Sequence, residues 1–332
     1  MTAVQSVQTV VVGDDDGEQR LDRFLKRRFP TLTQGQIEKF ARTGQLRVDG
    51  ARVKANDRVT PGQAVRVPPL PLKPPPEQEG HGVAAKDVEF IRNLVMHKDD
   101  DIIVLNKPFG LAVQGGTNTL RHIDAMLPAL AFERDNKPKL VHRLDRDTTG
   151  VLVLARHAAA AATLAAAFRG REMEKVYWAV VLGCPRPGQG QIRGWMRKAP
   201  GAHDADREMM VQCVQKDEGA VHAITDYTIM SEAAPRLSWV ALKPVTGRTH
   251  QLRFHMAEIG HAILGDPKYR CEREVPGELP NRLHLHARAI ALPHPNGKTL
   301  KLQAPLPDHM KQTFAAIGFE ESDGKNAFAA FE

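Results

Sequence analysis

His142-Arg143-Leu144-Asp145-Arg146-Asp147-Thr148-Thr149-Gly150 is followed directly by Val151-Leu152-Val153-Leu154-Ala155, and this abrupt change from polar to apolar residues is the clearest structural signal in the chain. The apolar half has the length and composition of a buried strand, so the polar half is predicted to be a loop at the end of a sheet. A carboxylate held in such a loop between arginines would stay ionised and keep a fixed direction, as a nucleophilic or charge-stabilising aspartate must. The alternative is that Asp145 or Asp147 only caps a turn before Gly150, and the surrounding sequence has to decide between the two.

The composition is that of a soluble globular protein with room for two domains. The chain has 332 residues, of which 42% are hydrophobic and 26% charged, and no apolar run reaches membrane-spanning length. Residues 1–16 carry three aspartates and no basic residue, so they lack the positive start of a signal peptide. The three cysteines, Cys184, Cys213 and Cys271, are odd in number, far apart and without the spacing of a zinc site. These features predict a cytoplasmic protein without a membrane partner.

The positive charge of the chain is concentrated near its N-terminus. Residues 18–67 hold twelve Lys/Arg and five Asp/Glu, a net charge of +7 that equals the net charge of the whole chain. A solvated charged face is the usual explanation of such a count. The concentration of the full excess in one small unit favours instead a polyanionic partner.

The same residues have the pattern of two helices followed by a small sheet. Apolar residues recur at helical spacing over residues 21–29, and Thr33 with Gln36 forms the capping-box signature of a second helix. Asp49-Gly50 is a tight-turn signal between two short strands. Residues 18–67 are therefore predicted to fold as a small basic domain.

A proline-rich segment separates this unit from the larger remainder. Six of the nine residues from Pro68 to Pro76 are proline, which predicts an extended linker over residues 68–87. Residues 88–318 alternate irregularly between strand-like and helix-like segments. We expect an α/β (α+β) domain there, with a mixed, largely antiparallel sheet and helices packed on it. The acidic tail over residues 319–332 is predicted to be mobile.

Three further polar clusters lie in the larger domain. Lys175 and Tyr177 open a predicted strand and share one of its faces, where a tyrosine is most often a core residue with a satisfied hydroxyl. The stretch from Gly247 to His255 has the pattern of a helix start rich in hydrogen-bond donors, which is commonly only a solvated basic face. His284 and His286 share a face of another predicted strand, but without a third ligand at a typical spacing no metal site is expected.

The basic unit resembles a known RNA-binding domain. Arg20-Leu21-Asp22-Arg23-Phe24-Leu25 and Gly44-Gln45-Leu46-Arg47-Val48-Asp49-Gly50 are similar to the alpha-L motif, the domain named after a small-subunit ribosomal protein. The resemblance implies that the two helices present basic side chains to structured RNA; the candidates are Arg23, Arg27, Lys39 and Arg42. Such binding rests mainly on phosphate neutralisation and carries little sequence information.

The polar clusters also occur together, in the order of one enzyme family. The chain resembles the bacterial large-subunit ribosomal RNA pseudouridine synthases of the RluA/RluC/RluD type, from about residue 18 to residue 307. The motifs that carry the resemblance are His142 to Ala155, Lys175-x-Tyr177, Gly247 to His255, Leu264-Gly265-Asp266-x-x-Tyr269 and Arg282-x-x-Leu285-His286-Ala287. Asn106-Lys107-Pro108 is most like the RluC branch. One departure is Tyr269-Arg270, where the family usually has Tyr-Gly.

The resemblance implies that the chain isomerises uridine to pseudouridine in large-subunit ribosomal RNA or its assembly precursor, without a metal or a small-molecule cofactor. It assigns Asp145 as the residue that acts on a flipped-out uridine, by attacking the sugar, attacking the ring or stabilising an intermediate. Arg253 would pair with Asp145, and Tyr177 would stack on the base and take part in the final proton removal.

Four more residues are expected to bind the RNA substrate. Arg143 matches the arginine that fills the space vacated by the flipped base, and Leu264 would complete an apolar wall of the pocket. Lys175 and Arg248 are basic residues of the same motifs and are predicted to contact RNA. We expect the protein to be a monomer.

Two other functions are compatible with the residues alone. A nucleoside or glycoside hydrolase would also use an ionised carboxylate, but it needs a second one, and Asp147 and Asp266 are the candidates. A non-catalytic RNA-binding ribosome-assembly factor would keep the aspartate loop only as structure. The presence of Asp145, Tyr177 and Arg253 together argues against a lost activity.

Overall fold

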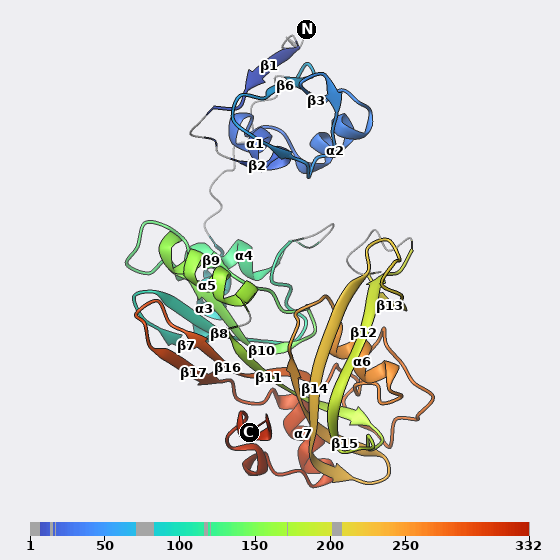
Figure 1. Ribbon diagram of the computed structural model, residues 1–332. Helices are drawn as coiled ribbons and strands as arrows, with labels where there is room; N and C mark the ends of the chain where they lie inside the picture. The colour runs from blue at the N-terminus through green and yellow to red at the C-terminus, as the bar shows by residue number, and fades with distance from the viewer. Residues whose placement is uncertain are drawn as a thin grey trace. The chain divides into compact units, whose positions relative to one another are not determined.

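The chain folds into two compact units. The computed structural model describes residues 7–13, 16, 18–70, 83–115, 119, 121–170, 172–200 and 208–331. These residues divide into one unit within Met1–Gly82 and another within Val83–Glu332 (Figure 1). Most of the predicted proline-rich linker, residues 71–82, lies outside the described residues.

The first unit consists of two helices and short strands around one apolar core. The helices are α1 (Leu21–Arg28) and α2 (Gln34–Arg42). One sheet has the strand order β1 (Gln8–Val11), β6 (Ala64–Val67), β3 (Arg47–Val48) and β4 (Ala51–Arg52). A separate two-stranded sheet consists of β2 (Gln19–Arg20) and β5 (Arg58–Val59). The predicted capping box is confirmed, because Thr33 and Gln36 each accept the other's backbone N–H. The predicted turn at Asp49-Gly50 is confirmed as well, with φ of 49° and 82°.

The second unit is built on an eleven-stranded sheet. Its main path runs β13 (Met210–Cys213), β12 (Gln189–Lys198), β14 (Val221–Ala233), β15 (Leu237–Pro244), β11 (Glu174–Leu182), β16 (Leu285–Pro293), β10 (Thr149–Ala155), β8 (Ile102–Lys107), β7 (Val95–Lys98). Strand β17 (Thr299–Gln303) pairs with β16, and β9 (Lys139–Leu140) pairs with β10. All pairs are antiparallel except β10 with β16. The expected mixed, largely antiparallel sheet is thus confirmed.

Helices cover this sheet, as Figure 1 shows. They are α3 (Ala85–Asn93), α4 (Ile123–Met126), α5 (Ala158–Gly170), α6 (Gln251–Glu258) and α7 (Asp308–Ile317), with 3-10 turns at Leu127–Leu130, Glu321–Gly324 and Ala329–Phe331. The alanine-rich face of α5 packs on β10, and α6 contacts β13, β14 and β15. Among the helices of the described residues, none combines the length and apolar character that a membrane span requires.

Strand β10 lies in the interior and positions the polar loop before it. All seven of its residues are buried. Leu152 and Leu154 join the cluster formed with α3 and α4, while Val151 and Val153 join the cluster under α5. Because the strand is apolar on both faces, the chain enters it at a fixed point, and the loop before it is held at the edge of the core.

Gly150 allows β10 to meet β16. Its φ is 105°, and a Cβ atom at this position would lie 2.2 Å from the carbonyl oxygen of Ala287. The parallel pairing is short, with Thr149 opposite His286 and Gly150 opposite Ala287. A residue without a side chain is therefore required where the polar loop becomes the strand.

The prediction of a mobile tail from residue 319 is wrong for the described residues 319–331. Phe319 and Phe328 are 5% and 3% exposed and pack into the cluster around Trp178 and Trp239. The two indole rings are 4.6 Å apart, and a Cβ atom on Gly324 would lie within 3 Å of both side chains. The tail packs against the large unit because its aromatic residues complete this core. The acidic composition of the tail did not indicate this packing.

Candidate active site

Lys107 holds the loop that carries Asp145. The Lys107 side chain is fully buried at the end of β8, and its Nζ donates to the carbonyl oxygens of Pro108 and Leu111 at 2.9 Å and of Arg146 at 2.8 Å. Burial lowers the pKa of Lys107 to about 7, an effect that Asp147 and Asp145 oppose. The contact with the carbonyl group of Arg146 fixes the backbone directly after Asp145.

The carboxylate of Asp145 faces two donor groups and remains accessible. Its side chain is 32% exposed, so a substrate can reach it. Arg253 Nη1 lies 3.6 Å and His250 Nε2 lies 3.7 Å from the same oxygen, Oδ2. The carboxylate that is predicted to act in the reaction thus lies beside Arg253 and is accessible from solvent.

Arg253 has a stronger partner than Asp145. Its Nε and Nη2 donate to the two oxygens of Asp266, each at 2.7 Å, and both side chains are almost fully buried. Asp266 also accepts the backbone N–H groups of Lys268 and Tyr269. The structure thus adds to the expected Arg253–Asp145 pair a bidentate clamp that orients the guanidinium group. Sequence reasoning missed this role of Asp266, although the Leu264-Gly265-Asp266 motif pointed to the residue.

Tyr177 and Lys175 lie on strand β11, and Tyr177 is close enough to Asp145 to feel its charge, whereas the Lys175 amine lies near Gly247. Burial, followed by the charge of Asp145, raises the pKa of Tyr177, so its hydroxyl keeps its proton at neutral pH. Burial lowers the pKa of Lys175. Between the two, Val176 belongs to the tryptophan cluster on the other face of the strand. The structure brings Asp145, Tyr177 and Arg253 together, as the sequence predicted.

The other predicted residues of the large unit lie farther from this centre. Arg143 is exposed, with Nη1 3.5 Å from the side-chain oxygen of Gln114, and Arg248 is exposed, donating from Nε to the carbonyl oxygen of His222 at 3.2 Å. Leu264 is only 1% exposed and packs in the tryptophan cluster. It therefore supports the Leu264–Asp266 segment from the interior. The sequence predicted that Leu264 lines the pocket, whereas the structure places it in this core.

The basic residues of the first unit lie on its surface. Arg23, Arg27, Lys39 and Arg42 are all exposed. Arg27 forms an ion pair with Asp16. Arg42 also lines a shallow pocket of about 420 Å³, together with Arg20 and Lys54. This unit therefore presents cationic side chains from both helices.

His286 on strand β16 (Leu285–Pro293) and His284 just before this strand have structural roles. His284 lies 2.7 Å from the hydroxyl oxygen of Thr313, and His286 lies 2.8 Å from that of Thr149. Burial lowers the pKa of His284 to about 4 and that of His286 to about 3. Each ring thus has its own hydrogen-bond partner in the core, and the two do not share a ligand.

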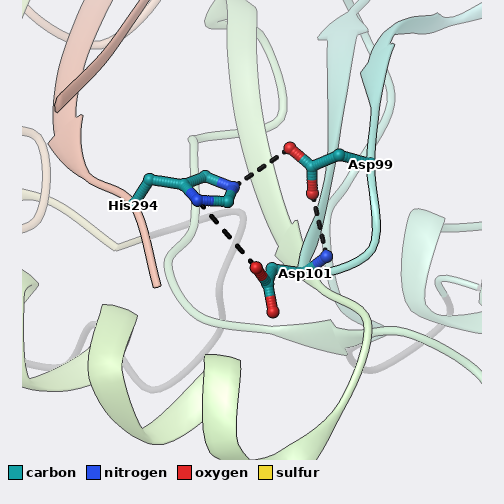
Figure 2. Close-up of side chains that lie close together, drawn as sticks. All are labelled: Asp99, Asp101 and His294. Carbon is teal, nitrogen blue, oxygen red and sulfur yellow. Dashed lines mark hydrogen bonds and ion pairs between the residues drawn. The ribbon is translucent and has the colours of Figure 1, made fainter. Parts of the chain in front are cut away.

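One group in the described part of the chain has the residue types of a metal site, namely Asp99, Asp101 and His294. Figure 2 shows that the two carboxylates face opposite nitrogens of the His294 ring. Nε2 lies 3.0 Å from Asp99, whereas Nδ1 lies 3.9 Å from Asp101 and accepts the backbone N–H of Asn296. Both ring nitrogens are thus already engaged by protein groups, and the cluster forms a hydrogen-bonded tie between the β7–β8 connection and the end of β16.

Comparison with known proteins gives one consistent family. Residues 101–258 match the model of the RNA pseudouridylate synthase family, and residues 19–65 match the S4 domain. The chain is 32% identical to RNA pseudouridine synthase 4, mitochondrial, of Arabidopsis thaliana, over 88% of this chain and 78% of that protein. It is 34% identical to ribosomal large subunit pseudouridine synthase C of Rickettsia typhi, over 87% of this chain and 94% of that protein.

A solved structure gives the same result. Human RNA Pseudouridylate Synthase Domain Containing 4 has a TM-score of 0.58 to this chain at 30% sequence identity, and the match covers 70% of this chain and 95% of the human one. The resemblances read from the motifs, for the basic domain and for the larger one, are both confirmed.

Proposed function

The chain belongs to the RNA pseudouridylate synthase family, and on that premise we propose that it isomerises specific uridines to pseudouridine in large-subunit ribosomal RNA. The observation that carries the proposal is the convergence of Asp145, Arg253 and Tyr177 at one accessible point of the large unit. The relatives named for the ribosomal large subunit support the choice of RNA.

The reaction breaks the bond between N1 of uracil and C1′ of ribose and forms a bond between C5 and C1′. N1 gains a proton and C5 loses one, so the RNA keeps its mass. Cleavage builds positive charge on the sugar, which an ionised carboxylate stabilises or captures. Asp145 supplies that carboxylate, Arg253 lies beside it and orients it, and Tyr177 stacks on the extruded base.

The geometry disfavours a hydrolase. A glycoside hydrolase needs a second carboxyl group that is free to donate or accept a proton. Both oxygens of Asp266 are occupied by Arg253, and its side chain is 1% exposed. Asp147, the remaining candidate, lies 3.6 Å from Arg146 and interacts electrostatically with buried Lys107. Neither is placed as a free acid or base.

Residues 18–67 are proposed as the domain that holds the RNA and residues 88–318 as the catalytic domain. The cationic surface of α1 and α2 supports binding to phosphate groups. We further propose a cytoplasmic monomer that uses no metal or small-molecule cofactor. In the described part of the second unit the large exposed apolar residues are three side chains far apart in sequence, Phe132, Val214 and Val275, which supports the monomer.

The test is the conversion of uridine in transcribed large-subunit ribosomal RNA, measured by primer extension after carbodiimide treatment and by nucleoside mass spectrometry. We expect the wild-type protein to produce pseudouridine at defined positions without a change in RNA mass. Asp145→Asn should lower the single-turnover rate at least ~1000-fold, because the charge that stabilises the transition state is lost.

Asp147→Asn is the matched control, because it removes a carboxylate two residues away on the same loop. It should retain the rate within about tenfold. Loss of the base from the RNA would identify a hydrolase, and RNA binding without any chemical change would identify an assembly factor.

A further inference from the structure

His250 is a buried titratable group in the site. The reaction described above assigns it no role. Its side chain is only 8% exposed, and its backbone has φ of 52° in the left-handed region. Among the described residues other than glycine, only Asp49 and Phe132 share a positive φ. A residue with a branched side chain persists there only when its surroundings hold it, and such outliers concentrate at functional sites.

The hydrogen bonds around His250 are compatible with a neutral ring that carries its proton on Nε2. The hydroxyl oxygen of Tyr269 accepts the backbone N–H of Met210 at 2.8 Å. It lies 3.0 Å from His250 Nδ1 and can give that nitrogen its single proton. With Nδ1 acting as acceptor, the proton of a neutral ring must be on Nε2.

That second nitrogen faces the catalytic carboxylate. His250 Nε2 lies 3.7 Å from Asp145 Oδ2, the oxygen that Arg253 also approaches. The distance is longer than a hydrogen bond, as is common at sites without substrate, which tighten when the substrate binds. Arg253 Nε and Nη2 are occupied by Asp266, so only Nη1 of this guanidinium group faces Asp145, and His250 offers a second contact to the same oxygen.

The environment of the ring keeps it neutral. Burial lowers the pKa of His250, Arg253 and Lys268 lower it further, and the carboxylates of Asp145 and Glu208 oppose this. A neutral ring can donate to Asp145 without neutralising its charge, whereas a charged ring would form a second ion pair there.

We propose that His250 is a positioning residue for Asp145: held by Tyr269, its ring presents the Nε2 proton to the carboxylate and fixes the direction in which Asp145 meets the sugar or the base. The inference rests on the proposed function, because it assigns His250 a part in that reaction. It adds the path Met210–Tyr269–His250–Asp145 to the ion pair with Arg253.

The test compares two substitutions that differ only in reach. In His250→Gln the amide nitrogen can take the place of Nε2, whereas in His250→Asn it reaches only the place of Nδ1. Asparagine also tolerates the left-handed backbone well. Under single-turnover conditions with prebound transcribed ribosomal RNA, we expect His250→Asn to lower the rate at least 30-fold and His250→Gln less than 5-fold. Both should bind the RNA within twofold of wild type.

The pH profile separates positioning from a structural role. Loss of a contact to the reacting carboxylate changes how the rate depends on pH, whereas a folding defect lowers the rate equally at every pH. We expect the rate profile of His250→Asn to be displaced by at least half a pH unit from that of wild type, and the profile of His250→Gln to coincide with wild type. Equal rates for the two variants, or a wild-type rate in His250→Asn, would overturn the proposal.

A spectroscopic measurement does not depend on turnover. In protein labelled with ¹⁵N-histidine, with the His250 signals identified by their loss in His250→Gln, the wild type should show the neutral ring protonated on Nε2 at pH 7. A ring protonated on Nδ1, or a charged ring, would overturn the proposal even if pseudouridine forms. Conversely, the Nε2 form in a protein that converts no uridine would refute the proposed function and leave the ring assignment intact.

Discussion

The orientation of each catalytic side chain in this site is set by buried neighbouring residues and not by its residue type alone. Asp145 is one of two aspartates in a charged loop, and what distinguishes it is a partly exposed carboxylate facing Arg253. Arg253 in turn is oriented by Asp266, and the loop backbone by Lys107. The motif residues Asp145, Tyr177 and Arg253 could be predicted from sequence, because their spacing matches a family pattern. The supporting roles of Lys107 and Asp266 could not be predicted, because they depend on contacts between residues that are not neighbours in the sequence.

Tyr177→Phe separates stacking from proton transfer. Phenylalanine keeps the ring that can stack on the base but lacks the hydroxyl, whose pKa is raised by burial and by Asp145. We expect RNA binding within twofold of wild type and a rate about 10- to 100-fold lower. RNA carrying deuterium at C5 of uridine should react more slowly in the variant than ordinary RNA, because removal of that proton becomes rate-limiting. Equal rates for both RNAs would place the hydroxyl outside the proton-transfer step.

Secondary-structure elements were predicted well where the signal is local. The capping box of α2 and the apolar run of β10 both form where the sequence indicates them. The start of α6 differs, since the helix begins at Gln251 rather than at Gly247, after the left-handed His250. Strand order was not predictable, because the parallel contact of β10 with β16 joins segments more than 130 residues apart.

The junction of β10 with β16 leads to a prediction for Gly150. In Gly150→Ala the new Cβ atom would meet the Ala287 carbonyl oxygen, and the positive φ would be strained as well. We expect a loss of at least about 3 kcal/mol in the free energy of unfolding, or no folded protein. Gly194→Ala in β12, where no atom lies within 4 Å of the new Cβ, should change it by less than about 0.5 kcal/mol. Urea denaturation of both variants checks this, and similar values would contradict the role given to Gly150.

The whole molecule should lose stability in mild acid because it keeps several histidines neutral in its interior. Burial lowers the pKa to about 3 for His142 and His286 and to about 4 for His255 and His284. Below pH 6.5 the unfolded chain binds these protons and the folded chain does not, so stability falls as the pH drops from about 6.5 toward 4. One such histidine accounts for about 3 kcal/mol over this range.

His286→Asn tests this account. The difference in unfolding free energy between pH 7.5 and pH 4.5, measured by urea denaturation, should be smaller than in wild type by about 2 kcal/mol. An unchanged difference would mean that other groups cause the acid sensitivity.

The packing of Phe319 and Phe328 against Trp178 and Trp239 has a consequence for biosynthesis. These phenylalanines are made after all described strands of the large sheet, so a nascent chain carries both indoles on an unfinished core until residues 319–328 leave the ribosome. Premature termination near residue 318 would release a product with this aromatic surface uncovered, a target for chaperones and proteases. Burial of the two tryptophans thus depends on the synthesis of residues 319–328, and their fluorescence would report when a newly made molecule has packed this segment.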